Sequence, residues 1–134
     1  MHDINVFNVS SAKPLPRKKI IDALLKTFKS EEAGEARVNV IFMNDDEIHE
    51  MNKKYLDHDY PTDVLSFPLH DEIVEGEIYI SVDTARIQAE EYGVSLTNEL
   101  RRLAVHGALH LIGYEDADEE SRRRMHELEN KYIA

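Results

Sequence analysis

The stretch AVHGALHLIGYED, residues 104–116, is an apolar run that contains two histidines four residues apart. From Leu103 to Ile112 the only polar side chains are those of His106 and His110. A helix that is apolar on nearly all sides is a buried helix, so we expect this segment in the centre of the domain. Side chains four residues apart share a helix face, which places the two imidazole rings one turn apart.

The residues that follow this helix point to a metal site. Gly113 suits the left-handed backbone that ends a helix and turns the chain back, and Glu115 and Asp116 come directly after the turn. Two imidazoles and one carboxylate, with the remaining positions open, make up a catalytic zinc site. We therefore predict His106 and His110 as metal ligands, with the carboxylate of Glu115 or Asp116 as the third. The alternative is a pair of core histidines that hydrogen-bond to backbone or carboxylate groups.

The residue after the first histidine excludes one familiar chemistry. Zinc peptidases place a glutamate directly after that histidine as the general base, whereas Gly107 has no side chain. A peptidase mechanism of the usual kind is therefore not expected.

The hydrophobic periodicity of the rest of the chain predicts an α+β domain. A single mixed β-sheet covered by helices is expected, with residues 1–134 forming one domain. Asp83 is predicted to cap one helix that Gly93 closes, and Ser95 or Thr97 to begin the next. The predicted strands span residues 4–9, 37–42, 63–69 and 76–82, and the predicted helices span residues 16–34, 44–55, 83–93, 95–112 and 118–134.

Composition narrows the cellular setting. There are no cysteines, which excludes disulfides and thiolate metal sites and fits a reducing compartment. The first ten residues lack the pattern of a secretory signal, and no stretch approaches 18 apolar residues. We expect a soluble cytoplasmic domain with no membrane partner.

The charge distribution bears on nucleic-acid binding. The net charge of −11 argues against binding to phosphate backbones, and we expect no DNA partner. Basic residues nevertheless cluster in residues 1–30, at Arg101–Arg102 and at Arg122–Arg124, on either side of the histidine segment. These clusters are either solvated helix faces or a local basic strip for RNA.

The segment HGALHLIGYED, residues 106–116, resembles the signature H-G-x-L-H-L-x-G-Y-D-H of the YbeY family of bacterial endoribonucleases and rRNA maturation factors. PTDVLSFP (residues 61–68), GEIYIS (residues 76–81) and NKKY (residues 52–55) are similar to further segments of that family, so the resemblance covers nearly the whole chain. It implies a metzincin-like zinc hydrolase with its metal site at the end of a buried central helix. It also implies cleavage of single-stranded RNA, with 16S rRNA 3′-end maturation and ribosome quality control as the setting and the ribosome as partner.

The chain departs from the family signature at two positions. Asp116 stands where the family has its third histidine ligand; an aspartate still ligates Zn²⁺, and it suits Mn²⁺ or Fe²⁺ as well. Leu56 stands where the family has an arginine suited to phosphate. Arg102, one turn before His106, is either the substitute for that arginine or an ordinary surface residue.

The expected mechanism is attack of metal-activated water on a phosphodiester. Glu115, Asp63 and His58 are the candidate general bases, and the sequence does not choose among them. A ribosome assembly factor with a structural metal and little catalysis, or a metal-dependent hydrolase of another substrate, are the alternative functions. The sequence defines no oligomeric state.

Overall fold

The computed structural model describes residues 2–12, 15–57, 62–70 and 72–134. Within these residues the chain forms one mixed four-stranded sheet and five helices, which confirms the α+β prediction. The strand order is β1-β2-β4-β3, with β3 antiparallel to β4 and the other neighbours parallel. The strands are β1 (His2–Asn8), β2 (Ala36–Met43), β3 (Val64–Pro68) and β4 (Val74–Ser81). The helices are α1 (Arg17–Ser30), α2 (Asp45–Leu56), α3 (Val82–Tyr92), α4 (Leu96–Ile112) and α5 (Glu119–Ile133).

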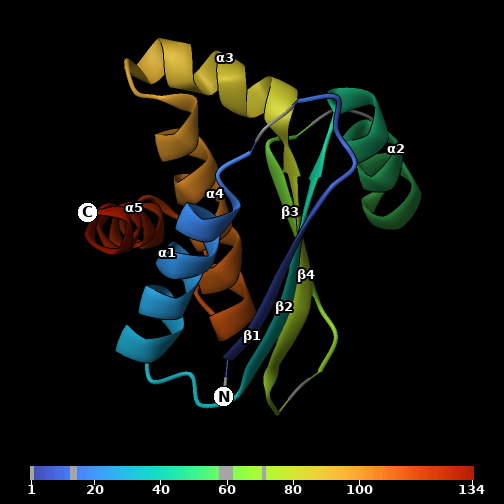
Figure 1. The fold of residues 1–134 in the computed structure, drawn as a ribbon. Coiled ribbons are helices and arrows are strands. Elements are labelled where there is room, and N and C mark those ends of the chain that lie inside the picture. The colour runs from blue at the N-terminus through green and yellow to red at the C-terminus, as the bar shows by residue number, and fades with distance from the viewer. Residues whose placement is uncertain (1, 13–14, 58–61, 71) are drawn as a thin grey trace.

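The core lies between the sheet and the helices α1, α4 and α5, while α2 lies on the opposite side of the sheet (Figure 1). Alternate residues of β2, among them Val38, Val40 and Phe42, face this core because side chains along a strand point to opposite faces. The buried face of α1 is narrow, since Leu24 and Phe28 are fully buried whereas the adjacent Leu25 is 37% exposed.

The helix α4 is the central helix, as its apolar sequence predicts. It contacts α1, α3, α5, β3 and β4. Gly107 allows its close approach to the sheet, because a Cβ atom there would lie 2.7 Å from Cγ2 of Ile78. Among the described residues, no helix is both long and apolar enough to cross a membrane.

One predicted helix cap is wrong. Asp83 does not cap α3; Ser81 does, by accepting a hydrogen bond from the backbone N–H of Thr84. The Asp83 carboxylate instead accepts from the side-chain amide of Asn44 and the backbone N–H of Asp45, and so stabilises the start of α2. Asp83 therefore stabilises α2, which is close to it in space, and not α3, in which it lies.

Two other predicted helix ends are confirmed, whereas α1 ends at Ser30 and not at residue 34. Ser95, rather than Thr97, caps α4 by accepting from the backbone N–H of Asn98. Gly93 ends α3 in the left-handed region.

Candidate metal centre

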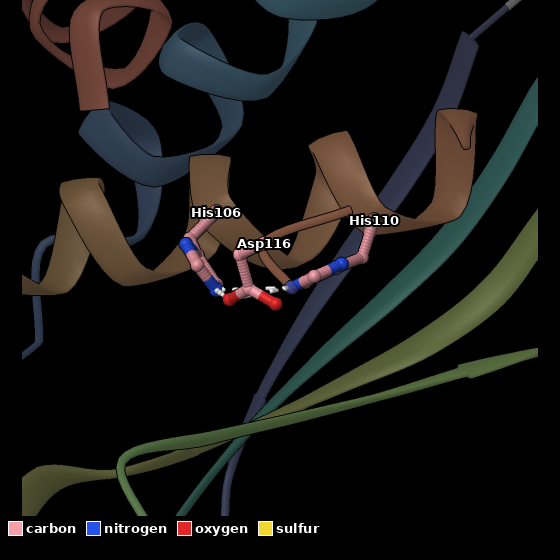
Figure 2. A group of neighbouring side chains, drawn as sticks. All are labelled: His106, His110 and Asp116. Carbon is pink, nitrogen blue, oxygen red and sulfur yellow. Dashed lines mark hydrogen bonds and ion pairs between the residues drawn. The ribbon is translucent and has the colours of Figure 1, made fainter. Parts of the chain in front are cut away.

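The three predicted ligands converge on one point at the C-terminal end of α4 (Figure 2). Nε2 of His106 lies 3.1 Å from Nε2 of His110, and each of these nitrogens lies 3.5 Å from Oδ2 of Asp116. Ligands around a tetrahedral ion with bonds of ~2.0–2.1 Å are separated by roughly 3.3 Å. The spacing therefore matches that of ligands on a single ion, and the group could hold a metal.

The turn after α4 brings the carboxylate back to the rings. Gly113 has φ of +120°, a backbone conformation that residues other than glycine rarely adopt. Its N–H donates hydrogen bonds to the carbonyls of Leu109 and His110. Arg122 then donates to the carbonyl of Asp116 at 3.3 Å, which ties the returning segment to α5.

Hydrogen bonds on the far side of each ring define its tautomer. Nδ1 of His106 lies 2.8 Å from the Glu129 carboxylate, and Nδ1 of His110 lies 3.0 Å from the carbonyl of Tyr114. Because both oxygens only accept, each Nδ1 donates its proton, and a neutral ring then keeps its lone pair on Nε2. Two lone pairs and a carboxylate thus face one another, so the donor set fits a cation between them.

The electrostatics of His106 agree with this description. Burial lowers the pKa of His106, while the hydrogen bond and the charge of Glu129 raise it. The charges of Asp116 and Asp63 raise it as well, and together these effects exceed that of burial. The net effect raises the pKa, so the surroundings of this ring favour positive charge.

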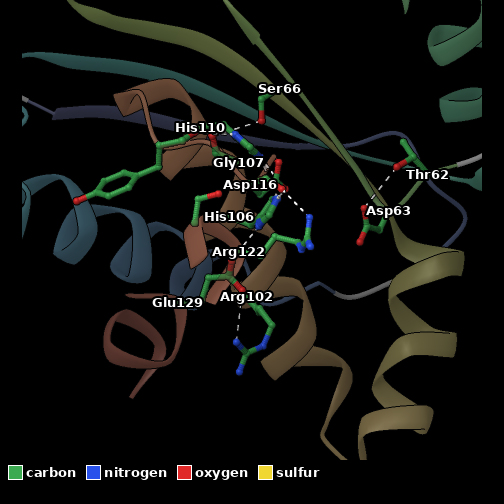
Figure 3. Close-up of polar contacts among 12 residues, drawn as sticks. Thr62, Asp63, Ser66, Arg102, His106, Gly107, His110, Asp116, Arg122 and Glu129 are labelled. Atoms are coloured by element: carbon green, nitrogen blue, oxygen red, sulfur yellow. Dashed lines mark hydrogen bonds and ion pairs between the residues drawn. The ribbon is translucent and has the colours of Figure 1, made fainter. Parts of the chain in front are cut away.

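A hollow of about 390 Å³ opens beside the three groups, and it brings Asp63 into the site. Asp63 faces the group from the start of β3 (Figure 3). Its carboxylate accepts from Gln88 at 3.1 Å and from Thr62 at 3.4 Å. The residues that line this hollow are Thr62, Asp63, Val64, Leu65, Ser66, His106, His110 and Asp116.

The serine of β3 has a structural contact here. Ser66 donates to the carbonyl of Gly107 at 3.3 Å and so joins β3 to α4. This contact gives Ser66 a role in the packing of α4 against the sheet.

Two other residues predicted for the site, Arg102 and Glu115, are less favourably placed to act beside the metal group. The guanidinium of Arg102 is held by Asn130 at 2.6 Å, by Glu129 at 3.4 Å and by Glu99 at 4.0 Å, so it is already paired. Glu115 is exposed and lines none of the hollows beside the metal group.

Two further predicted positions lie on or after α2. His58 lies outside the described residues. Leu56 is the last residue of α2 and is 43% exposed.

Sequence reasoning missed three residues near the rings. Glu129 is 6% exposed and follows Met125 by four residues, so it is a charge on the buried face of α5. Glu99 is 1% exposed and precedes Leu103 by four residues on α4, so it also lies on a buried helix face. A carboxylate on an apolar helix face was the available signal in both cases.

The third missed residue is Arg122, which no pattern distinguished from its neighbours. It lies beside Asp116 and lines a smaller hollow together with His106 (Figure 3). Its side chain is exposed, unlike that of Arg102.

The chain is similar to known proteins over most of its length. Residues 6–134 match the family model described as Endoribonuclease YbeY. Endoribonuclease YbeY of Chloroherpeton thalassium is 40% identical over 121 residues, which cover 90% of this chain and 86% of that protein. Its counterpart in Acholeplasma laidlawii is 38% identical over 133 residues, covering 98% of this chain and 94% of that protein.

A solved structure also resembles the whole chain. A Thermotoga maritima protein determined in solution superposes with a TM-score of 0.65 and 34% sequence identity, covering 99% of this chain and 87% of that one. Together with the family match over residues 6–134, this shows that the chain belongs to the endoribonuclease YbeY family.

Proposed function

We propose that this protein is a metal-dependent endoribonuclease that cleaves single-stranded RNA at the group formed by His106, His110 and Asp116. The observation that carries the proposal is the convergence of two ring nitrogens and a carboxylate beside an open hollow. The relatives named as endoribonucleases support the reaction class. We further propose that residues 1–134 act as one metzincin-like domain, with 16S rRNA maturation and ribosome quality control as the biological setting.

The ligands suit Zn²⁺, and the carboxylate of Asp116 suits Mn²⁺ or Fe²⁺ as well. A bound ion would supply a Lewis acid for a phosphate oxygen and lower the pKa of water. Glu129 and Tyr114 hold the two rings so that Nε2 of each points inward. These contacts fix the ligands before substrate arrives, which lowers the cost of reaching the reactive arrangement.

The proposed general base is Asp63. Among the predicted bases in the described residues, Asp63 lines the hollow and Glu115 does not. Its carboxylate can accept a proton from an attacking water, while Gln88 holds it in place.

The proposed phosphate contact is Arg122 rather than Arg102. Arg102 is paired with Glu99 and Glu129, whereas Arg122 is exposed beside Asp116 and contacts only a backbone carbonyl among the hydrogen bonds of the described residues. An arginine there can bind a phosphate oxygen next to the metal group.

A ribosome assembly factor with a structural metal is the second candidate. Leu56 favours it, since the family signature has an arginine at that position and this chain lacks it. Assembly activity would not require RNA cleavage, so a nuclease assay separates the two functions.

The test is cleavage of a labelled single-stranded RNA by purified protein, with a duplex of the same sequence as comparison. We expect cleavage of the single strand alone, loss with a chelator and recovery when Zn²⁺ or Mn²⁺ is restored. His110→Ala should abolish cleavage, while Glu115→Ala should retain it. Cleavage that survives both the chelator and His110→Ala would contradict the proposal, and binding without cleavage would favour the assembly factor.

A salt series tests the phosphate contact. RNA affinity should fall between ~50 and ~200 mM salt, and Arg122→Ala should reduce the slope by about one unit. Arg123→Ala is the matched control on the same exposed turn of α5. An unchanged slope in Arg122→Ala would remove Arg122 from the substrate site.

A further inference from the structure

A second hollow lies directly beside the metal group and has a different character. Its volume is about 490 Å³, within the roughly 300–1,000 Å³ range of small-ligand pockets. His106 lines both hollows, so a ligand that occupies this one lies next to the metal group. Its apolar wall is formed by Tyr92, Val94 and Leu103.

The charges of this hollow are unfavourable to a phosphate. Asp63, Glu99 and Glu129 line it, and the guanidinium of Arg102 is already held by two of these carboxylates. The fitting ligand is therefore a neutral group that presents N–H donors.

Glu99 supplies an unused acceptor. Its side chain is 1% exposed, and its Oε1 atom has no hydrogen-bond partner among the described residues. The nearest cationic atom, Nε of Arg102, lies 4.0 Å from this oxygen. A buried acceptor without a partner is costly, and a ligand N–H group removes that cost.

Tyr92 adds a stacking surface at the end of α3. Its side chain is 61% exposed although it lines the hollow, so one part of the ring remains open. Single-stranded RNA is recognised through unstacked bases that lie on aromatic rings and hydrogen-bond through their edges.

From these features we propose that the hollow binds one nucleobase of the RNA, stacked on Tyr92, with an amino-bearing edge towards the carboxylates of Asp63 and Glu99. The proposal rests on the proposed function for its substrate and adds a specificity to it. Cytosine presents an amino group where uracil of the same shape presents a carbonyl oxygen, which the carboxylates repel. The hollow therefore favours cytosine over uracil next to the cleaved bond.

The test compares the affinities of cytidine and uridine 5′-monophosphate for the metal-loaded protein at pH 8, above the raised pKa of about 7 of Glu99, so that its carboxyl group is ionised. The phosphate is common to both probes, so the difference between them reports the base. We expect the cytidine nucleotide to bind at least about fivefold more tightly. Tyr92→Ala should weaken the binding of both nucleotides by about tenfold. Tyr55→Ala, at a similarly exposed tyrosine on α2, should weaken neither.

Two isosteric substitutions test the edge contacts separately. Asp63→Asn and Glu99→Gln each place an amide where a carboxylate stood, so either should reduce the preference for cytosine. Equal affinity for the two nucleotides in the wild-type protein, or a Tyr92→Ala variant that binds both normally, would overturn the proposal.

Cleavage of RNAs that differ only by one cytosine-to-uracil exchange separates this proposal from the nuclease proposal. Cleavage without any base preference would keep the nuclease and overturn the base pocket. Base-selective nucleotide binding that depends on Tyr92, without RNA cleavage, would keep the pocket and overturn the nuclease.

Discussion

Oε2 of Glu129 lies 2.8 Å from Nδ1 of His106, so a carboxylate on α5 orients a ring on α4. The contact turns Nε2 of His106 towards Nε2 of His110, which lies 3.1 Å away. Both partners of this contact are largely shielded from water: the side chain of Glu129 is 7% exposed and that of His106 is 23% exposed. The last helix of the chain therefore belongs to the site although it supplies no predicted ligand.

The first prediction concerns this contact. Glu129→Gln keeps the shape of the side chain but removes its charge, so we expect metal affinity to fall by about 10- to 100-fold. Competition with a chromogenic chelator measures the affinity. Glu127→Gln, an exposed glutamate on the same helix, is the control and should bind normally. An unchanged metal affinity in Glu129→Gln would mean that the charge of Glu129 does not contribute to metal binding.

The second prediction concerns pH. Burial, with a smaller contribution from the charges of Asp63 and Glu129, raises the pKa of Glu99 from 4.5 to about 7, although Arg102 opposes the rise. The folded state therefore holds this proton more tightly than the unfolded state, and stability falls as pH rises from about 4.5 to about 7. Glu99→Gln lacks this titration, so over the same pH range we expect its free energy of unfolding to fall by on the order of 2–3 kcal/mol less than that of the wild-type protein.

Urea unfolding at pH 5 and pH 8 measures this effect as a difference between the two proteins. Comparing them in this way cancels the contributions of other titrating groups. A wild-type protein and a Glu99→Gln variant with the same pH dependence would show that Glu99 ionises as an ordinary surface carboxyl.

The third prediction concerns the approach of α4 to the sheet. In Gly107→Ala the new Cβ would lie 2.7 Å from Cγ2 of Ile78 and 3.0 Å from Oγ of Ser66. Overpacking costs about 1–3 kcal/mol, and alanine returns up to ~1 kcal/mol through its helix propensity. We expect a net loss of about 1–2 kcal/mol in the free energy of unfolding, with weaker metal binding because α4 must shift. A more stable Gly107→Ala variant would contradict this packing.

The fourth prediction concerns the turn that carries the third ligand. The hydroxyl of Tyr114 donates to Glu31 at 2.6 Å, and Tyr132 donates to the same carboxylate. Tyr114→Phe should cost about 1–3 kcal/mol in chemical unfolding, since a hydrogen bond to a charged group is lost. Metal affinity should change little, because the Tyr114 carbonyl that accepts from His110 remains. A large loss of metal with unchanged stability would contradict this division.

Much of the fold and the ligand group was predictable because local patterns determine them. The apolar run around His106 predicts a central helix, and Gly113 predicts the turn that returns Asp116 to the rings. The four strands and five helices follow the periodicity of their residues in the described parts of the chain. The structure supports the convergence of the three predicted ligands, while their role as ligands stays a prediction.

What the sequence could not give depends on contacts between distant elements. Asp83 has the position of a cap for α3, yet it stabilises α2 because the ends of two strands bring it there. Arg102 lies one turn before His106, but Glu129, 27 residues away, holds its guanidinium. Pairing of this kind depends on tertiary packing, which local propensity does not encode.

The proposed chemistry depends on one metal ion bound by His106, His110 and Asp116, and the metal content of the purified protein measures that binding. Protein purified without added ions should contain close to one equivalent of a transition metal by elemental analysis. His106→Ala and Asp116→Ala should lose it, while Glu115→Ala should keep it. Full metal content in Asp116→Ala, or loss of the metal in Glu115→Ala alone, would contradict the account.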